Sequence, residues 1–237
     1  MNAMYDPDAL ASRSESRTVA TNGVFNFVYG WMTVGLVVSG VVAWYCAQAF
    51  ESGALSTSLM MPATLVELAL FFVLIFAFRK LSSLMALALF LAFAAVNGVT
   101  LSIYVMAYKL GTLQSVFFIT AAMFAGMALY GTVTKRDLSG IGGLCSMALW
   151  GIIVAMIVNL FLKSSGMQTV ISVIGVLLFV GLTAWDAQKI KQLAEQEATL
   201  DRAMVRKLGI LCALQLYLDF INLFIFLLQL FGGKGRK

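Results

Sequence analysis

Three carboxylate side chains lie within or at the edge of apolar stretches, where a charged group is costly. Asp219 lies inside LYLDFINLF (residues 216–224), Asp186 ends another apolar run, and Glu67 lies within a third. A charged side chain at the centre of a bilayer costs roughly 2.5–3.5 kcal/mol on insertion scales. Because an asparagine would supply structural hydrogen bonds at lower cost, we interpret Asp219 as a functional group.

Asp219 belongs to a stripe of mainly polar residues at intervals of three and four. The stripe consists of Gln215, Asp219, Asn222, Phe226 and Gln229. This spacing places all five on one face of a helix. A polar face within a membrane is expected to turn from lipid toward other helices or water. Hydrogen bonding between helices would explain the amides but not the carboxylate.

The other two carboxylates each allow a structural explanation. Asp186 lies three residues before Lys189, so it could be an interfacial residue paired with that lysine. Glu67 has no basic residue within four positions. It could pair with a residue of another helix or be uncharged. The sequence leaves these alternatives open.

The composition places the chain among helical membrane proteins, since 61% of its 237 residues are hydrophobic and only 11% are charged. The net charge of +5 is spread over loops and termini and indicates topology rather than nucleic-acid binding. Histidine is absent, so a pH response near neutrality requires a perturbed carboxylate, lysine or cysteine.

Enzymatic chemistry and bound cofactors are not expected. The sequence has no histidine for a catalytic triad, no glycine-rich phosphate loop and no metal-ligand spacing. The dipeptides WD and LD, which contain Asp186 and Asp219, do not match the YD and GxGD motifs of intramembrane aspartyl proteases. The odd number and wide separation of the cysteines argue against a disulfide framework or a zinc site; they are Cys46, Cys145 and Cys212.

Seven apolar segments, each near the roughly 20 residues that a spanning helix needs, predict an all-α integral membrane domain over residues 24–232. They are residues 24–50, 59–78, 83–107, 113–134, 138–162, 168–186 and 208–230. Residues 1–23 lack the pattern of a signal peptide and are expected to form a flexible cytoplasmic arm. Residues 233–237 form a short basic tail.

The polar loop of residues 187–207 has a composition that favours helix, so the sixth and seventh spans could project beyond the bilayer. This matters for the two aspartates. At 1.5 Å per residue, Asp219 lies about 18 Å inside Lys207, whereas Asp186 lies only about 5 Å inside Lys189. The aspartates can meet only if the helices extend in this way, or if Lys189 snorkels from a deeper position.

The distribution of basic residues predicts a cytoplasmic N-terminus and an external C-terminus. Seven crossings put about twice as many basic residues inside as outside. The inside set is Arg13, Arg17, Arg79, Lys80, Lys135, Arg136, Lys189, Lys191, Arg202, Arg206 and Lys207. The outside set is Lys109, Lys163, Lys234, Arg236 and Lys237. Seven crossings put the basic tail outside, against this bias, but the last segment is long enough to span the membrane.

Four motifs resemble the transmembrane Bax inhibitor motif (Bax inhibitor-1) family, in its bacterial branch. They are NGVTLS (residues 97–102), KRDLSG (135–140), GLTAWDAQKI (181–190) and LYLDFINLF (216–224). The resemblance covers residues 29–232. It implies a seven-helix fold in which the last helix is central and is wrapped by the other six. It also implies a location in the bacterial plasma (inner) membrane.

The resemblance further implies that Asp186 and Asp219 form a pH-sensing pair near the cytoplasmic side, with weak affinity for calcium. A basic residue at the cytoplasmic end of the second helix would latch the pair closed; the candidate is Arg79, with Lys80 as the alternative. Where the family often has an arginine after LL in the last helix, this sequence has Gln229, which cannot form a salt bridge with Glu67. We expect the following to be supporting polar residues: Glu67, Gln215 and Asn222.

The sequence and the resemblance together favour a pH-sensitive calcium leak, with calcium and protons as its ligands and the lipid bilayer as its surroundings. Two carboxylates in a low-dielectric site would share a proton, and their oxygens suit a hard cation. The alternative is a non-conducting regulatory protein that binds a membrane-protein partner, for instance a membrane protease. A proton-coupled transporter is a third candidate, although no inverted repeat is visible.

Overall fold

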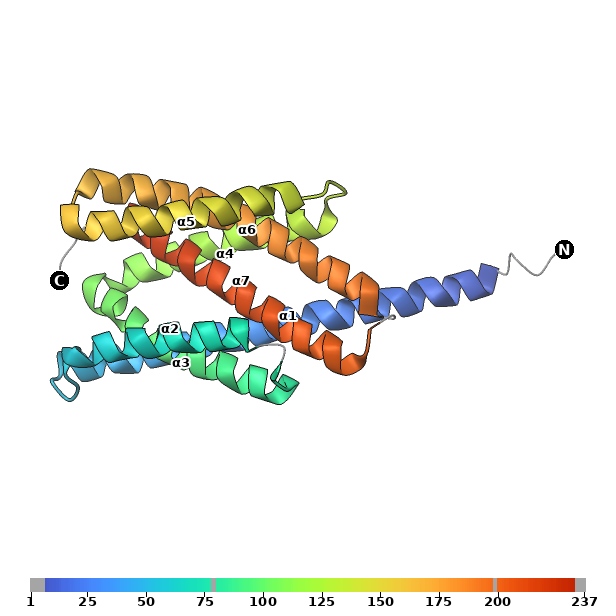
Figure 1. The fold of residues 1–237 in the computed structure, drawn as a ribbon, viewed down its shortest axis with the longest axis horizontal. Helices are drawn as coiled ribbons and strands as arrows, with labels where there is room; N and C mark the ends of the chain where they lie inside the picture. The colour runs from blue at the N-terminus through green and yellow to red at the C-terminus, as the bar shows by residue number, and fades with distance from the viewer. Residues whose placement is uncertain (1–6, 78–79, 198–199, 233–237) are drawn as a thin grey trace.

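The computed structural model describes residues 7–77, 80–197 and 200–232, with side chains from residue 22 onward. Within these ranges the chain forms seven long helices and one short 3-10 turn (Figure 1). They are α1 (Pro7–Glu51), η1 (Thr57–Leu59), α2 (Met60–Phe76), α3 (Ser83–Ala107), α4 (Leu110–Val133), α5 (Ser139–Leu162), α6 (Ser165–Gln196) and α7 (Arg202–Phe231). Each long helix is apolar and long enough to cross a membrane, which confirms the predicted seven-helix class.

α1 begins at Pro7, inside the segment expected to be a flexible arm. Residues 8–22 contain neither glycine nor proline, and proline is well suited to the first position of a helix. The apolar, spanning part of this helix begins at Asn22. Residues 1–6 and the basic tail of residues 233–237 lie outside the described part of the chain.

The predicted extension of the sixth and seventh helices is confirmed. α6 continues to Gln196 and α7 begins at Arg202, so most of the polar loop is helical. At the other end of α6, Lys163 adopts a left-handed conformation (φ 49°), and Ser164 caps the helix by accepting a hydrogen bond from the Met167 N–H. These two features end α5 and begin α6 within a tight turn, so the two helices pack antiparallel.

α7 is the most buried of the seven spans and packs against α1, α3, α4 and α6. α2 packs mainly against α3, and α5 packs mainly against α6. The expectation that all six other helices wrap the last one is therefore not confirmed. α2 and α5 lie at the periphery, where large apolar side chains such as Phe76 and Phe161 are exposed to the surroundings.

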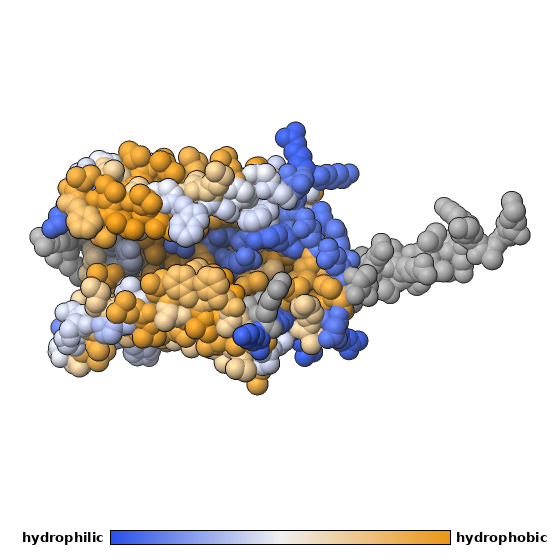
Figure 2. Space-filling view, in the orientation of Figure 1, coloured by the Kyte–Doolittle hydropathy of each residue, from blue (hydrophilic) through white to orange (hydrophobic). Residues whose placement is uncertain are grey.

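The two ends of the bundle differ in polarity. α1 enters the bundle at the end where α6 and α7 are joined, and α7 ends at the opposite end (Figure 1). Hydrophilic residues gather at the end where α1 enters, and apolar residues cover much of the remaining surface (Figure 2). This distribution agrees with a helical bundle that crosses a membrane, with one end more hydrophilic than the other.

Gly131 sets the approach of α4 to α6. A Cβ atom at this position would overlap the backbone carbonyl of Ala184. We expect Gly131→Ala to force the helices apart and to destabilise the fold by about 1–3 kcal/mol, the usual range for overpacking. Gly126→Ala on the same helix is the matched control, because its Cβ atom would meet nothing within 4 Å.

Thermal unfolding in detergent checks this prediction. The control should unfold at the wild-type temperature or slightly above it, since alanine favours helix over glycine by up to about 1 kcal/mol. Equal unfolding temperatures for the Gly131→Ala and Gly126→Ala proteins would contradict the assigned contact between α4 and α6.

Candidate functional site

The polar stripe of α7 faces α6 along most of its length. The contacts follow an antiparallel register, in which residue numbers fall along α6 as they rise along α7. They are Lys189 with Gln215, Asp186 with Asp219, Phe179 with Phe226, and Gln168 and Ser172 with Gln229. The predicted face is thus turned toward a neighbouring helix rather than toward lipid.

Asp186 and Asp219 form a buried pair within this interface. Their carboxyl groups lie within interaction range of each other. The residues are only 6% and 4% exposed. Asp186 Oδ1 and Asp219 Oδ2 are buried, and neither accepts a hydrogen bond from a described residue, although Asp186 Oδ1 lies in ion-pair contact with Lys189. The structure therefore brings the two predicted aspartates together and leaves an oxygen of each without a hydrogen-bond donor.

Among the described residues, Lys189 places its ammonium against this pair. Its Nζ lies 2.5 Å from Asp186 Oδ1, and the lysine side chain is 27% exposed. The ammonium also lies 3.9 Å from the ring centroid of Trp185 and 3.5 Å from Gln215 Oε1. A carboxylate, an aromatic face and an amide oxygen are favourable partners for an ammonium. Together they hold Lys189 over the pair.

The predicted latch residue, Arg79, lies outside the described residues, so its role stays a prediction. Lys80, the alternative, is exposed. The spacing of Asp186 and Lys189 had indicated an ion pair, but only as a structural explanation of Asp186. Their placement beside Asp219 could not be inferred from the spacing within α6, because it depends on the register between α6 and α7.

Glu67 belongs to a separate network. Its carboxylate accepts hydrogen bonds from Asn97 Nδ2 at 2.5 Å and from Thr100 Oγ1 at 2.8 Å. Asn97 Oδ1 accepts one from the Tyr217 hydroxyl at 2.7 Å, and that hydroxyl lies 2.6 Å from Ser39 Oγ. The network joins α2 to α3, α3 to α7, and α7 to α1. Glu67 thus has neutral partners from another helix, which is one of the alternatives left open by the sequence.

The other polar residues of the α7 stripe have different hydrogen-bond partners. Gln215 contacts Lys189 and so belongs to the aspartate site. Asn222 donates to the Leu218 carbonyl of its own helix, and this bond does not join it to the pair. Gln229 accepts hydrogen bonds from Gln168 and Ser172 of α6, away from the Glu67 network.

The carboxylate pair offers few ligands for a resident metal ion. Across the described ranges, no three His, Cys, Asp or Glu side chains come together as metal ligands. Calcium takes six to eight oxygen ligands in tight sites. Two carboxylates and the nearby Gln215 amide would supply only part of such a shell.

The chain is similar to bacterial membrane proteins over most of its length. Residues 21–236 match the family described as "Inhibitor of apoptosis-promoting Bax1". The inner membrane protein YbhL of Escherichia coli K12 is 46% identical over 210 residues, covering 87% of this chain and 90% of that protein.

Two further relatives show the same breadth of similarity. An uncharacterized protein of Borreliella burgdorferi is 40% identical over 87% of this chain and 90% of its own length. The uncharacterized protein YrjE of Lactococcus lactis is 36% identical over 93% of this chain and 95% of its own. With the family match over residues 21–236 and relatives similar over most of the chain, the chain belongs to the Bax inhibitor-1 family of membrane proteins.

Proposed function

We propose that the protein is a pH-sensitive leak for calcium or a similar cation, gated by Asp186 and Asp219. The observation that carries this proposal is the buried contact between the two carboxyl groups, with the Lys189 ammonium against one of them. A structural hydrogen bond between α6 and α7 would not require two acidic groups and a lysine. A switch whose charge changes with pH requires titratable groups such as these.

The proposed switch follows from the coupling between the two acids. Neighbouring carboxylates in a low-dielectric site cannot both ionise easily, so they gain and lose protons as one unit. At higher pH the pair bears more negative charge and holds Lys189 more strongly. At lower pH a proton weakens this attraction and favours opening. Protonation has two opposing effects on flux: it releases the Lys189 ammonium, and it weakens the attraction of the pair for the permeant cation. The proposed direction of gating requires that the first effect is the larger one.

Lys189 would then act as a tethered cation that competes with the permeant one. Its ammonium lies against the oxygens that a passing calcium ion would need. In the proposed closed state the lysine satisfies the pair. In the proposed open state it moves toward solvent, from which it is only partly shielded, and leaves the carboxylates to the cation. Arg79 remains a second candidate for the closing cation.

Calcium flux into liposomes that contain only the purified protein tests the proposal. Flux that rises as the pH is lowered supports a leak. A proton gradient that drives cation accumulation would indicate a coupled transporter instead. Absence of flux, together with specific co-purification of another membrane protein, would favour the regulatory function.

We also propose that the protein lies in a bacterial inner membrane, with the N-terminus cytoplasmic and the C-terminus external. Support comes from the inner-membrane relative, the distribution of basic residues, and the opposite positions of the start of α1 and the end of α7. We expect a cysteine placed at residue 2 to be protected from an impermeant thiol reagent in intact cells. A cysteine at residue 236 should react. For this assay Cys46, Cys145 and Cys212 are replaced by alanine. Labelling of both termini from one side would contradict seven crossings.

A further inference from the structure

Phe226 is the one apolar member of the polar stripe on α7. The other members of the stripe are Gln215, Asp219, Asn222 and Gln229. At 1.5 Å per residue, Phe226 lies about 10 Å along the helix from Asp219 and about 4.5 Å from Gln229. Phe226 therefore separates the part of the stripe that contains the aspartate from the amide at its end.

A phenylalanine of α6 meets Phe226 at this level. The ring centroids of Phe179 and Phe226 lie 5.9 Å apart, and the rings are stacked with 29° between their planes. Both residues are buried. The Phe226 ring also lies against Gly175 of α6, where a Cβ atom would come within 2.6 Å of Phe226 Cδ2. The ring thus occupies the space of a missing side chain on α6, and apolar atoms fill the interface at this level.

The aromatic stack lies between two polar sections of the same interface. Asp186 and Asp219 form the first section. In the second, Gln229 Oε1 accepts hydrogen bonds from Gln168 Nε2 at 2.8 Å and from Ser172 Oγ at 3.0 Å. The interface between α6 and α7 is therefore polar on both sides of the stack and apolar at the stack itself.

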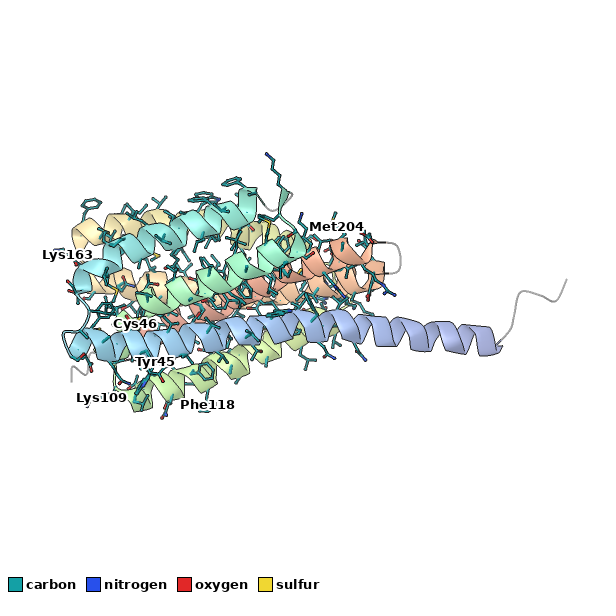
Figure 3. All side chains as sticks on the ribbon, turned by 90° about the horizontal axis from the view of Figure 1, so that it is seen from below. Tyr45, Cys46, Lys109, Phe118, Lys163 and Met204 are labelled. Atoms are coloured by element: carbon teal, nitrogen blue, oxygen red, sulfur yellow. The ribbon has the colours of Figure 1, made fainter. Side chains whose placement is uncertain are left out.

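The directions of the two helices give the order of these sections across the bundle. Figure 3 shows Met204, in the first turn of α7, and Lys163, which directly precedes the cap of α6, at opposite ends of the molecule. An ion that moves along the interface from the Met204 end would meet the aspartate pair first. It would then meet the aromatic stack, and last the amides near the Lys163 end.

We propose that the stack of Phe179 and Phe226 is an apolar barrier in series with the aspartate pair, which a cation must pass to cross the bundle. The inference rests on the proposed leak and adds a second barrier to it. A cation gives up water contacts in apolar surroundings, and an apolar constriction closes a channel by excluding water. The barrier does not itself depend on pH, because neither ring titrates. Charge controls passage at the aspartate pair, whereas apolar volume controls it at the stack.

Removal of one ring distinguishes this barrier from the pH sensor. Phe226→Ala should raise calcium flux into liposomes at acidic pH by at least about five-fold, because the stack limits the flux once the aspartate pair is open. The pH at which the flux is half-maximal should stay unchanged, since Asp186 and Asp219 are retained. Phe226→Leu keeps most of the apolar volume and should leave the flux close to that of the wild-type protein.

Phe220→Ala is the matched control. Phe220 lies on the same helix and is as buried as Phe226, but its ring meets Phe117 and Phe124 of α4. Loss of a buried phenylalanine leaves a cavity at either position, so loosened packing alone would affect both variants. Equal increases in flux for the two variants, or no increase for Phe226→Ala, would overturn the barrier. A pH-dependent flux in the wild-type protein would still support the proposed leak.

Thiol accessibility tests the barrier without ion flux. The protein, with its three cysteines replaced by alanine, is placed in lipid nanodiscs so that both ends of the bundle meet water. Asn222→Cys introduces a thiol between the pair and the stack, and Gln229→Cys introduces one beyond the stack; both positions are half-buried. At alkaline pH a cationic methanethiosulfonate should modify Gln229→Cys at least about ten-fold faster than Asn222→Cys. Adding Phe226→Ala should bring the two rates together.

Equal rates for the two thiols in the protein that retains Phe226 would overturn the barrier, and this comparison remains valid even if the Phe226→Ala protein fails to fold. A ten-fold difference in a protein that conducts no calcium would support the barrier and contradict the leak. The two proposals can therefore fail separately.

Discussion

Asp219→Asn is expected to produce a protein whose cation flux no longer follows pH. The substitution keeps the size of the side chain and its ability to hydrogen-bond to Asp186, but it removes the group that titrates. It also places an amide where Asp219 Oδ2 now lies buried without a donor. Calcium flux into liposomes, measured over a series of pH values across neutrality, tests this expectation. A pH dependence equal to that of the wild-type protein would exclude Asp219 as the sensor.

Asp137→Asn is a suitable control for this experiment. Hydrogen bonds from the side chain and backbone N–H of Ser139 lower the pKa of Asp137, which lies on a connecting segment. The carboxylate therefore stays ionised over the tested range and gains a proton only at more acidic pH. Its replacement should leave the pH response of the flux unchanged.

Asp186→Asn should alter gating about as much as Asp219→Asn, and the double substitution should add little more. Groups that act as one unit give non-additive effects, whereas independent groups give additive ones. Here the carboxyl groups are in direct contact, so each aspartate loses its titrating partner when the other is replaced. Strictly additive changes in the flux would show that the two aspartates work separately.

The features best predicted from the sequence are those that depend on one helix at a time. Length and apolar composition were enough to identify seven spans. The spacing within the last span was enough to identify a polar face that includes Gln215 and Asp219. The polar composition of residues 187–207 also predicted helix, and the extension of α6 and α7 through this segment resolves the apparent difference in depth between the two aspartates.

Features that depend on contacts between helices were predicted less well. The network of Glu67, Asn97 and Tyr217 joins three helices, and no spacing within one segment indicates it. The arrangement of α2 and α5 at the periphery also follows from packing rather than composition, because all seven spans are similarly apolar. In a membrane, hydropathy identifies the helices but does not rank their distance from the centre of the bundle.

Lys189→Gln is expected to leave a protein that leaks even at alkaline pH. The Lys189 ammonium is the charge in contact with Asp186, and glutamine removes it while retaining a polar side chain of similar length. Hydrogen bonds to charged groups contribute about 1.5–3 kcal/mol, and a change of this size shifts an equilibrium between open and closed states by about ten-fold or more. Flux at alkaline pH should therefore rise by at least about ten-fold.

Two further substitutions distinguish the charge of Lys189 from other effects. Lys189→Arg keeps the positive charge and should remain closed at alkaline pH, although the guanidinium will meet Trp185 and Gln215 with a different geometry. Lys191→Gln removes a nearby charge from the same helix and should leave the leak unchanged. If Lys189→Gln stays closed at alkaline pH while Arg79→Gln leaks, the closing cation is Arg79. The contact between Lys189 and Asp186 would then have a structural role only, as an ion pair at the end of an apolar segment.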